Sequence, residues 1–198
     1  EKNTEGTQNV AVGLNALKNN LTGNCNTSVG YQSLNNNTTG VGNIAIGKNS
    51  LLSNTTASNN TAVGTCSLNA TTTGCQNTAV GMASLDSNTT GDNNVAVGMQ
   101  SLLSNTTADN NSALGYQALS VNTTGHSNNA FGYRALRCNT TASNNTAVGF
   151  CSLFANTTAN ENTAIGHTAL TANTTGCQNT AVGSLAGYDV TTGNNNLL

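Results

Sequence analysis

Side chains suited to catalysis or metal binding are few in this 198-residue chain and widely spaced. His126 and His167 each lack the neighbouring nucleophile and acid that nucleophilic catalysis needs. No Cys-x-x-Cys motif and no Cys/His cluster provides the ligand spacing of a zinc site. We therefore expect neither an enzyme nor a metalloprotein, and no cofactor. The six cysteines are Cys25, Cys66, Cys75, Cys138, Cys151 and Cys177.

Two acidic residues, Asp92 and Asp109, lie 17 residues apart and could in principle bind calcium. However, the chain lacks the Gly-Gly-x-Gly-x-Asp pattern of calcium-binding β-rolls. We interpret the pair as solvated carboxylates in turns.

An Asn-x-Thr motif is more frequent, and this motif is the acceptor for N-glycosylation in secreted eukaryotic proteins. A turn rich in Asn and Thr also produces the motif without any glycan, so both interpretations stay open. In a solvated turn, regularly spaced acceptors would coat one edge of the molecule with glycans. The candidates are Asn20, Asn37, Asn54, Asn88, Asn105, Asn122, Asn139, Asn156 and Asn173.

A strict repeat sets the spacing of these sites. The pattern Asn-x-Ala-(Val/Ile)-Gly, seen at residues 77–81, recurs with its glycine at every 17th residue from Gly13 to Gly183. A fixed period without insertions is typical of solenoid proteins. We number each coil from 1 to 17, with Thr7 at position 1.

Seventeen residues are too few for a pair of helices, because helical repeats need about 33 residues. We predict one strand at positions 3–7, a second at about 9–12, and a turn at the Asn-Thr-Thr-(Gly/Ala) of positions 14–17. The fold class is therefore all-β, a parallel β-solenoid (β-roll). One repeat domain spans residues 1–198, with eleven coils over 7–193 and partial coils at 1–6 and 194–198. At roughly 4.8 Å per coil, the rod is on the order of 50 Å long.

In-register coils place like residues on like residues. A column of identical Asn side chains at position 3 predicts an amide hydrogen-bond ladder. These residues are Asn9, Asn26, Asn43, Asn60, Asn77, Asn94, Asn111, Asn128, Asn145, Asn162 and Asn179, followed by Asn196 in the last partial coil.

Strand alternation places the Ala of position 5 and the Gly of position 7 on one side, and position 6 on the other. We expect a thin interior of Ala, Gly and the Leu of position 11, with position 6 forming an outward apolar stripe that marks an interface. The alternative is that position 6 faces the core. The stripe is Val12, Val29, Ile46, Val63, Val80, Val97, Leu114, Phe131, Val148, Ile165 and Val182.

Composition and cysteine spacing restrict the partners. Five Lys and Arg residues cannot form a phosphate-binding face, so we expect no nucleic-acid partner. No apolar run is long enough for membrane insertion. Cysteines of one column lie at least five coils apart, roughly 24 Å, beyond the disulfide reach of about 7 Å. We expect free thiols, with bridges between chains as the alternative.

The motif Asn-Thr-Ala-Val-Gly-x-x-(Ser/Ala)-Leu at residues 77–85 resembles the head repeats of YadA-like trimeric autotransporter adhesins and the related repeats of phage and bacterial tail fibres. The resemblance covers nearly the whole chain. It implies a left-handed, often trimeric β-roll that serves as a rigid rod or receptor-binding head. It also implies a location outside the cell, at the cell surface or on a virion.

The expected function is a structural segment of a fibre that self-associates as a trimer or an end-to-end filament. Adhesion to glycans or to a cell-surface receptor is an open option, as is a glycan coat. The alternative is an ice-binding (antifreeze) β-solenoid, because regular Thr ladders can order water. Against it, the Thr pair of each coil is adjacent and lies in a turn, whereas ice-binding faces place Thr two apart on a strand.

Overall fold

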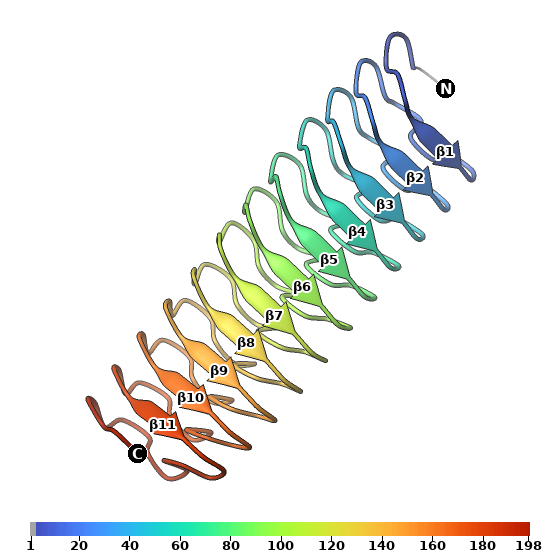
Figure 1. Cartoon of the computed structure of the whole chain (residues 1–198). Helices are drawn as coiled ribbons and strands as arrows, with labels where there is room; N and C mark the ends of the chain where they lie inside the picture. Colours follow the sequence, from blue (N-terminus) through green and yellow to red (C-terminus); the bar gives the residue numbers. More distant parts are fainter. Residues whose placement is uncertain (1–2) are drawn as a thin grey trace.

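Each repeat contributes one three-residue strand to a single parallel sheet. The computed structural model describes residues 3–198, so residues 1 and 2 of the predicted first partial coil lie outside it. Its eleven strands pair in chain order, each with the strands of the coils before and after it (Figure 1). They are β1 (Val10–Val12), β2 (Thr27–Val29), β3 (Ile44–Ile46), β4 (Thr61–Val63), β5 (Thr78–Val80), β6 (Val95–Val97), β7 (Ser112–Leu114), β8 (Asn129–Phe131), β9 (Thr146–Val148), β10 (Thr163–Ile165) and β11 (Thr180–Val182).

The register is in phase throughout, as the 17-residue period predicts. Ala79 of β5 pairs with Ala96 of β6, and Ala96 pairs with Ala113 of β7. A bridge between Thr180 and Leu197 continues the pattern beyond β11. The predicted all-β parallel solenoid is therefore confirmed. No helix able to cross a membrane is found in residues 3–198.

The second predicted strand, at positions 9–12, is wrong: this part of each coil is a series of turns in the described chain. Gln100 and Leu102 at positions 9 and 11 have φ angles of 58° and 49°, whereas strands need negative φ. The coils still bond to each other here, because Leu102 N–H donates to Ala118 C=O (3.0 Å) and Gln100 N–H to Met82 C=O (3.0 Å). Coil-to-coil hydrogen bonding thus persists without β backbone geometry.

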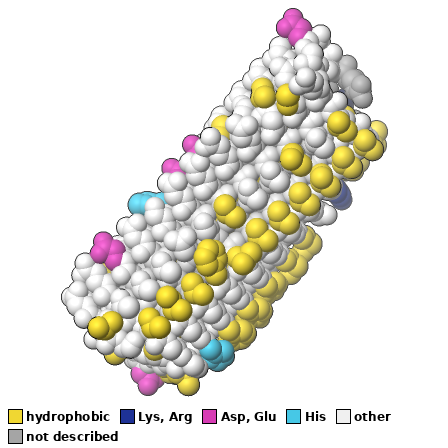
Figure 2. All heavy atoms as spheres, viewed as in Figure 1, with side chains coloured by type: hydrophobic (Ala, Val, Ile, Leu, Met, Phe, Trp, Pro, Cys, Tyr) yellow, Lys and Arg dark blue, Asp and Glu magenta, His cyan; other side chains and the backbone are white. Residues whose placement is uncertain are grey.

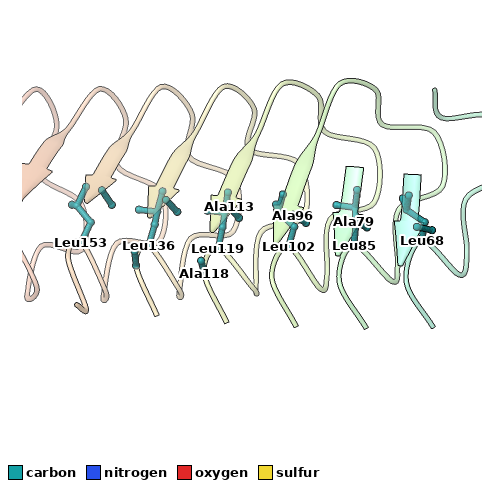
Figure 3. Packing of buried hydrophobic residues seen from close by; sticks show 14 of the residues in the cluster. Leu68, Ala79, Leu85, Ala96, Leu102, Ala113, Ala118, Leu119, Leu136 and Leu153 are labelled. Carbon is teal, nitrogen blue, oxygen red and sulfur yellow. The ribbon is translucent and has the colours of Figure 1, made fainter. Parts of the chain in front are cut away.

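The interior is thin, with the Ala of position 5 and the Leu of position 11 as its main apolar columns and the Ser or Ala of position 10 buried beside them. Ala96 and Leu102 are fully buried, whereas Ala11 in the first coil is exposed. Figure 3 shows these Ala and Leu side chains following one another along the coils. Position-6 side chains lie on the opposite side of the strand and are exposed or half-buried, so the alternative with position 6 in the core is wrong.

The glycines of position 7 fix how closely the coils approach. Gly98 has a φ of 129°, which residues with a Cβ rarely adopt. A Cβ on Gly98 would also lie 2.5 Å from the carbonyl oxygen of Gly115 in the next coil. Both the backbone conformation and the coil spacing therefore require glycine at this position.

We predict that Gly98→Ala lowers the free energy of unfolding by about 2–4 kcal/mol, because the new methyl group meets backbone that cannot yield locally. The measurement is chemical denaturation followed by circular dichroism. Gly42→Asn is the matched control, since Gly42 occupies position 2, where Asn59 and Asn93 adopt the same left-handed conformation. Equal stability of Gly98→Ala and the parent would contradict the packing role of the column.

Candidate functional surfaces

The Asn residues of position 3 form a ladder that mostly joins side chain to backbone. Oδ1 of Asn94 accepts the backbone N–H of Asn111 (3.0 Å), and Nδ2 of Asn111 donates to the carbonyl of Gly125 (2.9 Å). Direct side-chain pairs occur in some coils, such as Nδ2 of Asn94 to Oδ1 of Asn77 (3.2 Å). Each amide therefore needs both its donor and its acceptor, and the column is structural.

The glycosylation candidates, at position 14, are not solvated, and this prediction needs correction. All nine side chains, Asn20, Asn37, Asn54, Asn88, Asn105, Asn122, Asn139, Asn156 and Asn173, are 0% exposed.

Their Nδ2 atoms are also engaged in hydrogen bonds. Nδ2 of Asn122 donates to Oδ1 of Asn105 (3.0 Å) and to the carbonyl of Gly125 (2.8 Å). A glycan replaces one hydrogen of Nδ2 and needs a path to solvent. The turn folds over its Asn because this amide satisfies buried backbone and neighbouring amide groups, so the folded coil leaves no place for a glycan.

The two Thr residues that follow point to different environments. The position-15 hydroxyls bond within the solenoid, as in Thr106 Oγ1 to the carbonyl of Thr123 (3.2 Å). The position-16 side chains are exposed in every coil, and none of their hydroxyls bonds to another group within residues 3–198. They are Thr22, Thr39, Thr56, Thr73, Thr90, Thr107, Thr124, Thr141, Thr158, Thr175 and Thr192.

Asp92 and Asp109 act as backbone acceptors. The N–H of Cys75 donates to Oδ1 of Asp92 (2.6 Å), and the N–H of Asp92 donates to Oδ1 of Asp109 (2.7 Å). Residues 3–198 contain no group of three His, Cys, Asp or Glu side chains placed to hold a metal ion. Both carboxylates remain half-exposed, and Oδ1 of each also accepts a backbone N–H from the preceding coil, so position 1 adds to the coil-to-coil hydrogen bonding.

The thiols and histidines are not brought together into a reactive site. All six cysteines are free; Cys25 is exposed and the others are half-buried. Burial raises the pKa of the Cys151 thiol, and the positive charge of nearby Arg134 partly offsets this shift. The His126 ring approaches Ser127 Oγ (3.4 Å), whereas His167 stacks on Phe150.

Sequence reasoning missed a stack of aromatic rings at position 8. Tyr116, Tyr133, Phe150 and His167 follow one another in consecutive coils with ring centroids 5.4, 5.0 and 5.2 Å apart and nearly parallel planes. Arg134 lies beside two of these rings, 5.0 Å from the Tyr133 centroid and 5.9 Å from that of Tyr116. The 17-residue spacing of these residues was a signal that could have revealed the stack.

No pocket is formed by the residues that the structure describes, so the candidate sites are open surfaces. Comparison with family models, curated proteins and solved structures found no match for the chain.

The position-14 ladder has one internal gap, at Thr71. Oδ1 of Asn54 and Oγ1 of Thr71 are buried without a hydrogen-bond partner. Asn88 restarts the ladder: its Oδ1 accepts from Nδ2 of Asn105, but its own Nδ2 donates only to the carbonyl of Gly91. Unpaired buried polar groups destabilise a protein by about 1–3 kcal/mol. The gap is therefore a weak point in the rod.

We predict that Thr71→Asn raises the free energy of unfolding by about 1–3 kcal/mol, because Asn at this position can bond to both Asn54 and Asn88. Thermal and urea unfolding would measure the change. Thr73→Asn makes the same chemical change at an exposed site and should leave stability nearly unaltered. A destabilised Thr71→Asn variant would show that the ladder is not limited by its missing amide.

Asp86 is a second unsatisfied position. Burial raises the pKa of its carboxyl above the usual 3.8, and a hydrogen bond with Asn69 offsets part of this shift. Its Oδ1 has no hydrogen-bond partner. A carboxyl whose pKa is raised on folding contributes stability below its usual pKa and loses that contribution as the pH rises through the folded value.

We predict that Asp86→Asn stabilises the protein at pH 7, by less than about 1 kcal/mol because solvent screens a half-buried charge. The gain should vanish below pH 3.8, where the parent carboxyl is protonated in both states. Melting temperatures measured from pH 3 to pH 7 test this, with exposed Asp189→Asn as the control. A gain that does not depend on pH would rule out the charge as its cause.

Proposed function

We propose that the chain is a structural segment of a fibre, a rigid rod that associates with other copies through the outward face of its sheet. The carrying observation is the position-6 stripe. Its exposed fractions include 51% for Leu114, 39% for Phe131 and 60% for Val182. Figure 2 shows rows of hydrophobic side chains running along the rod.

The stripe is continuous because the register never slips. A strip on the order of 50 Å long and about 10 Å wide covers on the order of 500 Å² per chain. Position 4 adds further exposed apolar side chains in three coils, at Val10, Ile44 and Val95. Continuous apolar surface of this size usually marks an interface. Burying it would contribute roughly 12 kcal/mol before the costs of association.

Stiffness supports the same proposal. Each coil is tied to the next by strand pairing, by the position-3 and position-14 amides and by the position-15 hydroxyls. These bonds recur in most coils, and the gap at Thr71 interrupts only the position-14 amides, so the rod has few places at which to bend.

The setting of this fibre is the exterior of a cell or a virion, with an adhesive or receptor-binding role, and the proposal follows the resemblance of the repeat to adhesin heads and tail fibres. Copies arranged around a threefold axis would hide the stripe, and end-to-end stacking would lengthen the fibre. The proposed fibre carries no glycan coat, because the position-14 Asn side chains are buried.

The alternative is ice binding, which the position-16 column favours. Its Thr side chains are exposed, regularly spaced and free to bond water. The neighbouring position-1 column is mixed, including Val41, Asp92 and His126, so the regular surface is one column wide. A thermal-hysteresis assay separates the candidates, because activity of the isolated chain would favour ice binding over the fibre.

We predict that Val97→Asp disrupts assembly but not folding, because it places a charge in the middle of the apolar stripe. Native mass spectrometry would show smaller species than the parent, while circular dichroism stays unchanged. Thr90→Asp adds the same charge to the exposed Thr column and should preserve assembly. A monomeric parent, or a Val97→Asp variant of unchanged native mass, would contradict the proposed interface.

A further inference from the structure

We propose that Arg134 and Arg137 form a binding site for the carboxylate or sulfate groups of an acidic polysaccharide that lies along the rod. The inference gives a ligand class to the adhesive role proposed above and depends on that role only for its biological setting. The arginine site does not include the position-6 stripe on the outward face of the sheet.

The first observation is the convergence of two cations on one neutral acceptor. Nε of Arg134 and Nε of Arg137 donate to the same oxygen, Oε1 of Gln117, at 3.1 and 3.3 Å. Like charges held this close repel each other. Since a single amide oxygen neutralises neither, the pair favours an anion.

The second observation is that the chain supplies no such anion. No Asp or Glu occurs between residues 110 and 160, although the net charge of the whole chain is −2. The nearest acid in sequence before the pair, Asp109, is used as an acceptor by the backbone of Asp92. Two of the five Lys and Arg residues of the protein therefore lie together without a carboxylate of their own.

The third observation is that aromatic rings hold the guanidinium groups in place. Arg134 lies 5.0 Å from the ring centroid of Tyr133, and Arg137 lies 5.9 Å from that of Phe154. Only Nε of each group is engaged in a hydrogen bond within the described residues, so the terminal N–H groups can form paired bonds to an oxyanion. Side chains fixed by stacking lose less entropy on binding.

The surroundings favour a linear saccharide. Nε2 of Gln117 donates to Oε1 of Gln100 (2.9 Å), so Gln100, Gln117 and Arg134 form a polar row along the rod. The aromatic stack of position 8 lies next to it in sequence, with Tyr133 and Phe150 exposed. An open strip with amide and guanidinium groups beside aromatic rings suits a polymer that carries both hydroxyl groups and anions.

Other polyanions fit less well. Nucleic acid needs a series of phosphate contacts. The other described cations, Lys18 and Lys48, belong to coils near the N-terminus, several coils away from Arg134 and Arg137. An acidic protein normally needs a contact area above about 1,000 Å² with an apolar centre. On this rod, the apolar surface that could form the centre of a protein interface is the position-6 stripe, not the surface around the two arginines.

The test is a titration of the full chain by calorimetry with heparin and polygalacturonate oligosaccharides, with neutral dextran as the uncharged reference and polyglutamate as the acidic-peptide probe. We expect binding of at least one anionic saccharide, weakening with added salt, and no binding of dextran. Arg134→Gln/Arg137→Gln should weaken it at least tenfold. Lys18→Gln/Lys48→Gln removes the same charge elsewhere and should change affinity less than twofold.

A second variant separates the contribution of the planar guanidinium donors from that of the positive charge. Arg134→Lys/Arg137→Lys keeps both charges but loses the planar donors, so we expect an intermediate loss with an unchanged circular dichroism spectrum. The inference is overturned if no anionic saccharide binds, or if polyglutamate binds as tightly as the saccharides. It is also overturned if Lys18→Gln/Lys48→Gln loses as much affinity as Arg134→Gln/Arg137→Gln. Native mass of the same variants reports assembly separately, so failure of this site is distinguishable from failure of the fibre proposal.

Discussion

In-register stacking of 17-residue coils shapes both the interior and the surface of this solenoid. In the regular columns each side chain meets its own kind one coil away, so such a column is stable only when a residue is compatible with a copy of itself. Asn satisfies this condition because its amide both donates and accepts, as in the pair Asn105 and Asn122. A column of carboxylates would repel itself. The low charged fraction of 6% follows from this selection.

Close stacking also decides which residues line the interior. Glycine at position 7 lets the coils approach, and the small Ala of position 5 leaves room for the Leu of position 11, as seen at Gly98, Ala96 and Leu102. A coil this thin has one sheet, and no other part of residues 3–198 covers the outward face of that sheet. The same constraint that builds a stable rod therefore leaves an apolar stripe exposed on it.

Residues that depart from the repeat account for the chemical differences between coils. Thr71 interrupts an amide ladder, and Asp86 places a charge in a column between Asn69 and Leu103. Arg134 is the one charge in the position-9 column, whereas Arg137 shares the position-12 column with Lys18 and Asp86. Where the repeat is regular, its side chains explain the architecture, whereas these irregular positions carry the chemical differences between one coil and another.

The period and the strand at each Asn-x-Ala-Val-Gly motif could be predicted from the amino-acid sequence, because a fixed repeat and strand alternation are local properties. Alternation placed Ala and position 6 on opposite sides of the strand, but only the stacked coils showed that Ala faces the core. The backbone of positions 9–12 forms turns that bond to the neighbouring coils, and Asn122 is buried with its amide bonded to Asn105 of the coil before it. The meeting of Arg134 and Arg137 on Gln117 also required the stacked coils, since residues of different coils become neighbours only when the solenoid winds.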